Sequence, residues 1–203
     1  MHVDFLLEEE SAEAALNLLL PRLLPAACTF KCIPHQGKDD LLSRLPGRLR
    51  NYARLLPTNP ELRVMVLMDA DADCRKRKME LERLVAAAGL PTKTSALAGQ
   101  SFQVVTRLAV AELEAWFLGD RAAIQAAYER VHAHHFKGLP SIPDEIPDAW
   151  ETLWRVLQRA NLYPAGKAKV EWARTIAPHL SPDPARNTST SFRYFCEGLA
   201  ALR

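Results

Sequence analysis

The spacing of apolar residues switches repeatedly along the first part of the chain between the patterns of strands and helices. Short apolar runs typical of strands fall at residues 3–7, 29–35, 63–68 and 101–110. Between them, leucine and alanine recur every three or four residues, which predicts helices over residues 11–21, 41–56, 81–88 and 111–120. Ser11 is placed to cap the first of these helices.

This alternation of strand and helix predicts an α/β fold with a mostly parallel sheet of about four strands, flanked by helices. The run at 63–68 is apolar almost throughout, as expected of a strand buried on both faces of a parallel sheet. Right-handed crossovers place every strand-to-helix turn at one edge of such a sheet. Ligands of open α/β sheets bind along that edge.

The later part of the chain has a different pattern. A proline-rich segment spans residues 138–147, and helical spacing then resumes from Asp148 and over 169–177 and 192–202. A polar loop precedes the last helix, which Ser189 or Ser191 can cap. We therefore expect an α/β domain over residues 1–130 and a helical extension over 131–203 that packs on it.

Composition and charge exclude several classes of protein. The 203 residues are 48% hydrophobic and 25% charged, as in an ordinary globular protein, and the formal net charge is only +2. A polyanion would therefore have to bind a local patch, because the chain has no strong overall field. With four cysteines, no secretory leader and no long apolar stretch, the sequence predicts a cytoplasmic protein with reduced thiols and no membrane contact.

Acidic residues follow three of the predicted strands. They are Glu8, then Asp69 and Asp71, then Glu112 and Glu114. Two carboxylates about 4 Å apart repel by ~4 kcal/mol at an effective dielectric near 20, so a site that gathers several requires a cation or a proton. Carboxylates with water suit Mg²⁺ or Mn²⁺, and these five residues, together with Asp73, are the predicted metal ligands.

Helix capping and calcium binding compete with this role for the acids. Asp73 can simply cap the helix that follows it, and Glu9 and Glu10 can stabilise a helix N-terminus through its dipole. One cap does not require the two preceding aspartates. A calcium-binding loop starting at Asp69 is excluded, because Cys74 occupies the position that needs glycine and a strand precedes the loop.

Basic residues near the same edge are candidates for holding phosphate. Lys38 lies in the turn HQGKDD, and Gly37 beside it lets the backbone approach a ligand closely. The full set of predicted substrate-binding residues is His35, Gly37, Lys38, Arg75, Lys76, Lys167 and Lys169. The basic run at 75–78 can also be a solvated helix face. Cys28, Cys32 and His35 lack a fourth ligand for zinc, and we expect HAHH at 132–135 to be an exposed helix end.

Beyond these patterns, the chain resembles a known family. The stretches FLLEEESAEAALNLLLPRLLP, PHQGKDDL, VMVLMDADADC and RLAVAELEAWFLGD, with TIAPHL and STSF near the end, resemble the bacterial Toprim-like family called domain of unknown function 4276. The most specific of them are ELEAWFLGD and the strand-borne Asp-x-Asp-x-Asp-Cys. Together the matching stretches extend over nearly the whole chain.

This resemblance implies a Mg²⁺-dependent phosphoryl-transfer site like that of the overcoming-lysogenisation-defect nucleases. Glu8 would be a ligand or general base, Asp69 and Asp71 would hold metal, and Lys38 would assist catalysis. A topoisomerase or primase would need further parts that we do not find, so we expect a nuclease, which acts on nucleic acid. Such proteins are associated with a partner ATPase and with phage defence. The alternatives are a non-catalytic partner subunit of an ATPase and a small-molecule phosphohydrolase.

Overall fold

The computed structural model describes residues 1–70 and 73–203, so Asp71 and Ala72 lie outside the described part of the chain. In that part, four parallel strands form one sheet in the order β2-β1-β3-β4. The strands are β1 (His2–Leu7), β2 (Thr29–Pro34), β3 (Leu62–Asp69) and β4 (Val104–Ala109). The predicted α/β class and parallel sheet are confirmed, with β2 and β4 at the two edges.

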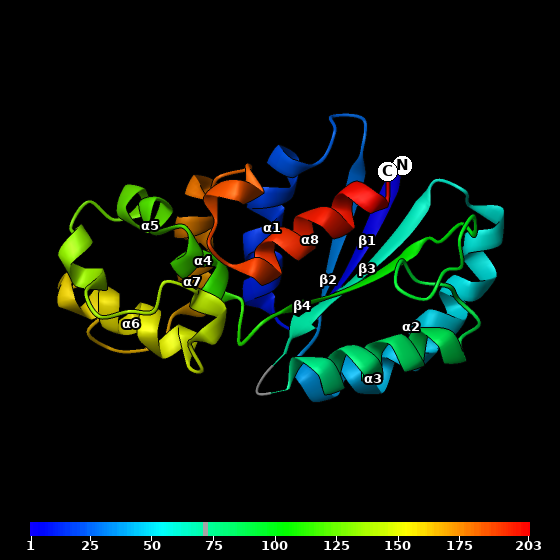
Figure 1. Ribbon diagram of the computed structural model, residues 1–203, viewed down its shortest axis with the longest axis horizontal. Coiled ribbons are helices and arrows are strands. Elements are labelled where there is room, and N and C mark those ends of the chain that lie inside the picture. The colour runs from blue at the N-terminus through cyan, green and yellow to red at the C-terminus, as the bar shows by residue number, and fades with distance from the viewer. Residues whose placement is uncertain (71–72) are drawn as a thin grey trace.

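Helices cover both faces of this sheet (Figure 1). Phe5 and Met65 belong to one hydrophobic cluster, which includes side chains of α1 (Glu10–Leu23) and α8 (Thr190–Ala201). Leu6 and Val66 belong to the other, with side chains of α2 (Lys38–Leu55) and α3 (Cys74–Ala87). Neighbouring strand residues point to opposite faces, so a strand as apolar as β3 is buried on both sides.

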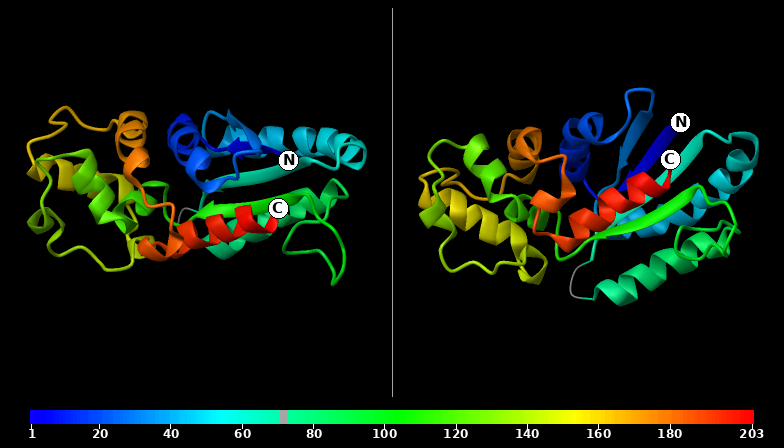
Figure 2. Two further views of the ribbon diagram at one scale, coloured as in Figure 1. Left: turned by 90° about the horizontal axis from the view of Figure 1, so that it is seen from above. Right: turned by 45° about the horizontal axis from the view of Figure 1, so that its top comes forward.

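The remaining helices gather at the end of the sheet where the strands terminate (Figures 1 and 2). They are α4 (Glu114–Gly119), α5 (Arg121–Ala127), α6 (Ala149–Arg159) and α7 (Lys169–Ile176). Short 3₁₀ turns connect the elements at η1 (Leu56–Thr58), η2 (Ala133–Phe136), η3 (Pro143–Glu145), η4 (Ala177–His179) and η5 (Pro184–Arg186). None of the helices described is long and apolar enough to cross a membrane.

One hydrophobic cluster joins the sheet to these helices. Trp116 of α4 packs 4.9 Å from Phe195 of α8 between ring centroids, and Phe195 lies 6.4 Å from Phe5 of β1. Buried residues of α5, α6 and α7 belong to the same cluster. The helices at the carboxyl end of the sheet are therefore held rigidly against it by a shared core.

Two local predictions are wrong: His135 of the segment HAHH is buried rather than exposed, and Ser11 does not cap a helix. Ser11 lies inside α1, whose N-cap is Glu9, and the Ser11 hydroxyl donates a 2.6 Å hydrogen bond to Glu9 Oε1. The helix begins earlier than its apolar pattern suggested, because acidic residues in a first turn stabilise a helix N-terminus. The predicted cap at Ser189 is confirmed, since its side chain accepts a hydrogen bond from the Phe192 N–H.

Candidate active site

The predicted acids of β1 and β3 meet at the carboxyl edge of the sheet. These two strands are adjacent and parallel, with Leu7 in register with Leu67, so Glu8 emerges beside the end of β3. Its Oε2 accepts a 3.0 Å hydrogen bond from the backbone N–H of Asp69. Residues from separate chain segments therefore contribute to one acidic site.

A buried lysine lies at the centre of the other acids. Lys169, the first residue of α7, has a side chain only 10% exposed. Its Nζ lies 3.3 Å from Glu9 Oε1, 3.4 Å from Glu114 Oε2 and 3.8 Å from Glu112 Oε1. The ammonium group thus neutralises part of the charge that β1, β4 and their following turns bring together.

The electrostatics of the site follow from burial and crowding. Burial raises the pKa of Asp69 well above its usual range, and the Glu8 and Glu114 carboxylates raise it further. Burial also raises the pKa of Glu114 to about 7, although Lys169 counteracts this. Burial alone would lower the pKa of Lys169, but Glu114, Glu9 and the other carboxylates outweigh it and raise that pKa. Lys169 is therefore charged, while the acids compete for protons or cations.

Glu112 and Glu114, which both follow β4, both approach this lysine. Ala111 has a φ of 61°, in the left-handed region, and turns the chain from β4 into α4. Glu112 is also held by the backbone N–H of Trp150, which donates to its Oε2 at 2.8 Å. Glu114 is fully buried, and among the described residues neither of its carboxylate oxygens accepts a hydrogen bond.

A cavity of about 700 Å³ adjoins the acids and contains several of the predicted substrate-binding residues. His35, Gly37, Lys167 and Lys169 line it, as does Arg174, which sequence reasoning missed. The predicted Lys38 begins α2 next to Gly37. This side of the site therefore combines basic groups with the backbone turn that precedes a helix.

Gly37 and His35 are fixed to the end of β1. Gly37 has a φ of 94°, which favours glycine, and its N–H donates to the Glu8 carbonyl at 2.9 Å. His35 Nδ1 donates to the Leu7 carbonyl at 2.8 Å. Burial lowers the pKa of His35, so the ring is neutral and its Nε2 is an acceptor. That buried Nε2 has no hydrogen-bond partner in the described chain.

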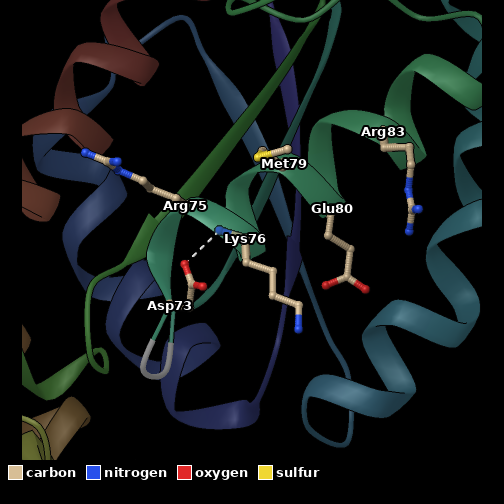
Figure 3. A pocket seen from close by; sticks show the side chains of 6 residues that line it. All are labelled: Asp73, Arg75, Lys76, Met79, Glu80 and Arg83. Atoms are coloured by element: carbon tan, nitrogen blue, oxygen red, sulfur yellow. Dashed lines mark hydrogen bonds between the residues drawn. The ribbon is translucent and has the colours of Figure 1, made fainter.

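Other predicted site residues lie elsewhere. The Asp73 side chain accepts a hydrogen bond from the Lys76 N–H and caps α3, the simpler of the two roles considered for it. Arg75 and Lys76 line a different cavity of about 600 Å³ on α3 (Figure 3). Asp71 lies outside the described residues. Within residues 1–70 and 73–203, no three histidine, cysteine, aspartate or glutamate side chains are grouped closely enough to hold a metal ion.

Comparison with known proteins identifies the family. The model of the family described as Domain of unknown function (DUF4276) matches residues 7–200. The chain belongs to this family. No curated protein and no solved structure matches it.

The structure explains why the DUF4276 chain carries the segment ELEAWFLGD. The two glutamates enter the acidic site, and the indole N–H of Trp116 donates to Ser191 at 2.9 Å. A Cβ on Gly119 would lie 2.0 Å from Asn187 Oδ1, so only glycine fits there. Asp120 caps α5 and accepts a hydrogen bond from the Ser181 N–H. The segment therefore joins the site to the C-terminal helices.

Proposed function

We propose that this DUF4276 protein is a divalent-metal-dependent enzyme that cleaves phosphodiester bonds, a nuclease of Toprim-like type. The observation that carries the proposal is the meeting of Glu8 and Asp69 at the end of two adjacent parallel strands, beside the buried Glu114. In open α/β sheets this edge is where ligands bind. Perturbed carboxylates gathered beside a cavity are typical of catalytic sites.

Charge balance supports a cation at this site. Four carboxylates, those of Glu9, Asp69, Glu112 and Glu114, act on the ammonium group of Lys169, and the Glu8 carboxylate acts on Asp69. Lys169 carries a single positive charge among these acids, which favours the uptake of protons or of a metal ion at the site.

The types of donor fit Mg²⁺ or Mn²⁺, because all are hard carboxylate oxygens. Asp69 and Asp71 are the principal proposed ligands, and Glu8 is either a further ligand or the general base. Glu114 lies beside Asp69, and its Oε2 is paired with the Lys169 ammonium group at 3.4 Å, so in the described chain it balances that cation rather than completing a ligand set. A bound ion would supply positive charge at the scissile phosphate and lower the pKa of a water molecule.

The protein's own residues have complementary roles in this proposal. Lys167, Lys169 and Lys38 hold phosphate oxygens at the cavity, and Gly37 lets the backbone come close to them. His35 Nε2 accepts a hydrogen bond from the substrate or from water. Glu8 takes the proton of the attacking water as general base. Glu114, with a pKa of about 7, exchanges a proton readily near neutral pH.

The family resemblance favours this reaction over its alternatives. Toprim-type sites of the overcoming-lysogenisation-defect nucleases join a glutamate to an Asp-x-Asp pair, as Glu8 and Asp69-Ala70-Asp71 do in sequence. The same resemblance suggests a partner ATPase and a place in phage defence. A non-catalytic subunit would keep the acids and turn over nothing, and a small-molecule phosphohydrolase would not need to bind nucleic acid.

Cleavage of supercoiled plasmid and of labelled single-stranded oligonucleotides tests the proposal. We expect nicking or shortening with Mg²⁺ or Mn²⁺, none in EDTA, and loss of activity by at least about 100-fold in Glu8→Gln and Asp69→Asn, because each removes a charged oxygen from the metal site. Glu129→Gln is the matched control, since Glu129 is exposed in the segment after α5 and is not part of the lining of this cavity. Unchanged cleavage in Asp69→Asn would contradict the proposal.

If the purified protein is inert alone, the same assay with its partner ATPase distinguishes the non-catalytic subunit from the enzyme. A subunit role predicts that Asp69→Asn still supports the activity of the complex. Hydrolysis of small phosphate esters without any salt-sensitive binding of nucleic acid would instead identify the phosphohydrolase.

A further inference from the structure

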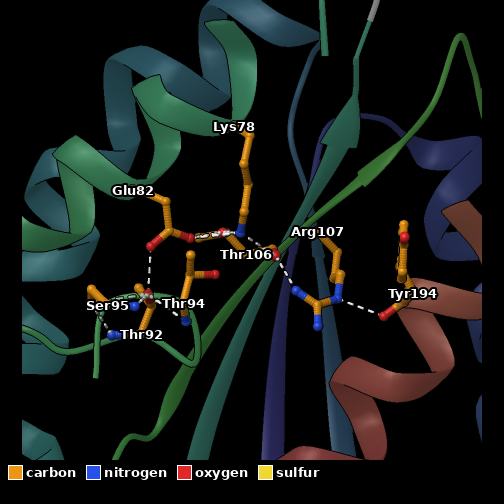
Figure 4. A network of polar contacts seen from close by, with 8 residues as sticks. All are labelled: Lys78, Glu82, Thr92, Thr94, Ser95, Thr106, Arg107 and Tyr194. Carbon is orange, nitrogen blue, oxygen red and sulfur yellow. Dashed lines mark hydrogen bonds and ion pairs between the residues drawn. The ribbon is translucent and has the colours of Figure 1, made fainter. Parts of the chain in front are cut away.

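A groove lies along the β4 edge of the sheet, outside the acidic site. Helix α3 forms one wall, α8 forms the other, and the edge strand β4 forms the floor. Its volume is about 640 Å³. Figure 4 shows Lys78 of α3, Arg107 of β4 and Tyr194 of α8 around this strand.

The groove concentrates positive charge in a chain that is nearly neutral overall. Arg75, Lys78, Lys93 and Arg107 line it, and Glu197 is the one acidic residue among the described residues of its lining. The formal charge of the whole chain is only +2, so this is a local patch rather than a property of the composition. A patch of this kind complements a polyanion.

Two of the cations are held in place. Lys78 Nζ donates to Glu82 Oε1 at 2.6 Å and to the Thr106 carbonyl at 3.0 Å. Arg107 Nε donates to the Tyr194 carbonyl at 2.6 Å, and its Nη1 donates to the Thr106 carbonyl at 2.9 Å. A Cβ on Gly198 would lie 2.7 Å from Arg107 Nε, so α8 can approach this guanidinium group only with glycine there. The groove is thus preorganised.

An edge strand can also bind a peptide by adding a strand to the sheet, but β4 is poorly suited to it. The Thr106 carbonyl already accepts hydrogen bonds from Lys78 and Arg107. Lys93 N–H is bonded to the Val104 carbonyl at the start of the same strand. Charged side chains therefore cover the edge that a peptide would need, which favours a polyanion over a protein strand.

The groove leads toward the acidic site. It extends along β4 from Thr106 to Val110, and the residue before Val110, Ala109, is in register with Asp69. At its rim, the Tyr194 residue is 55% exposed. An exposed aromatic ring beside basic residues is the arrangement on which a nucleic-acid base stacks.

We propose that the groove between α3 and α8 binds single-stranded nucleic acid and guides it to the acidic site. Phosphates pair with Arg75 and Lys93, and a base stacks on Tyr194. The volume is that of a small-ligand pocket, which suits a few nucleotides of a single strand. Only the statement that the nucleic acid is guided to the acidic site rests on the proposed function, because binding in the groove does not require cleavage.

Fluorescence anisotropy in EDTA with a labelled single strand of about 12 nucleotides, within the usual site sizes, measures the binding. We expect Arg75→Glu with Lys93→Glu to weaken it about tenfold or more and to flatten its salt dependence, because two phosphate contacts are lost. Tyr194→Ala should weaken it about fivefold or more. Lys31→Glu is the matched control for either substitution made singly, since it makes the same charge change as each of them, on β2 at the opposite edge. Circular dichroism checks the fold of each variant.

Hydrolysis of thymidine 5′-p-nitrophenyl phosphate with Mn²⁺, measured on the same proteins, reports on the acidic site separately. Loss of oligonucleotide binding with unchanged ester hydrolysis supports the groove. The same loss with no hydrolysis by any protein supports the groove while the proposed function fails. Three results would overturn the proposed binding in the groove. They are unchanged affinity in the groove variants, an equal loss of affinity in Lys31→Glu, and tighter binding of a duplex through the same residues.

Discussion

Lys169 Nζ lies 3.4 Å from the buried Oε2 of Glu114, and it is the residue on which the charge balance of the acidic site depends. The two side chains come from α7 and α4, more than fifty residues apart in the chain. Breaking a buried ion pair by removing one partner costs about 3–5 kcal/mol, because the other charge stays buried without compensation.

Replacing this lysine should therefore destabilise the metal-free protein and increase its response to metal. We expect Lys169→Met to lower the free energy of unfolding by about 3 kcal/mol or more in EDTA. We also expect a larger rise in Tm on adding Mg²⁺ than in the wild-type protein, because an ion can then take the place of the ammonium group. Thermal unfolding with and without Mg²⁺ measures both effects.

Lys167→Met is the control for that experiment, since Lys167 is exposed and its Nζ lies 4.8 Å from the centroid of the Trp150 ring. It should change stability by well under about 1 kcal/mol. A Lys169→Met protein as stable in EDTA as the wild-type protein would show that the lysine does not compensate the acids.

The raised pKa of Glu114 predicts how stability depends on pH. Its ordinary value is 4.5 and its value in the fold is about 7, so between these limits the folded protein keeps a proton that the unfolded chain loses. The free energy of unfolding should consequently fall as pH rises from 4.5 to 7, and this contribution should level off above 7. Urea unfolding at pH 5 and pH 8 in EDTA measures the fall.

Glu114→Gln should reduce that fall, because the amide stays neutral throughout. Part of it should remain, since the pKa of Asp69 is also raised. The exposed Glu10→Gln should leave the pH dependence as it is in the wild-type protein. A Glu114→Gln protein with an unaltered slope would rule out the buried carboxyl as its source.

Gly119 should be intolerant of any side chain. An added Cβ would lie 2.0 Å from Asn187 Oδ1 and 2.9 Å from the backbone nitrogen of Ser189. The Asn187 amide also donates to the Trp116 carbonyl at 2.9 Å, so it cannot move without loss. We expect Gly119→Ala to destabilise the protein by about 1–3 kcal/mol, measured by urea unfolding.

Gly47→Ala provides the matched comparison within a helix. Gly47 lies inside α2, and the nearest atom to an added Cβ is Arg50 Nη2 at 3.9 Å. This substitution should stabilise the protein by about 0.5–1 kcal/mol, because alanine favours the helix. Equal effects at the two glycines would disprove the close approach at Gly119.

Asp73 offers a test that separates capping from metal binding. Asp73→Ala should cost about 1 kcal/mol, through loss of the hydrogen bond to the Lys76 N–H, while Asp73→Ser should retain most of the cap. Both variants should cleave substrate as the wild-type protein does under the proposed function. A large loss of metal-dependent cleavage in Asp73→Ser would restore this residue as a metal ligand.

The sheet was predictable because each of its strands has a local signal. The apolar run of β3 and the alternating segments of β1, β2 and β4 are each bounded by turn residues or helix-forming patterns. Parallel pairing then brought Glu8 to Asp69 with no further information, since strand ends share one edge.

The role of Lys169 was harder to predict from the sequence. The sequence placed it among the predicted substrate-binding residues, yet its three carboxylate contacts depend on how α7 packs against α1. Glu9 likewise had a sufficient local role at the start of α1. Long-range packing fixed both positions, and no local pattern reports it.

The position of α8 affects how the protein is made. Phe192 and Phe195 complete the cluster that covers Phe5 of the first strand, and Arg63 Nε donates to the carbonyl of Leu202. During translation the sheet and α1 can form early, but the part of this face that α8 covers stays exposed until α8 leaves the ribosome. The acids at the edge of the sheet likewise lack the positive charge of Lys169 until that residue has been synthesised. A nascent chain therefore cannot assemble this centre before α7, which carries Lys169, has been synthesised.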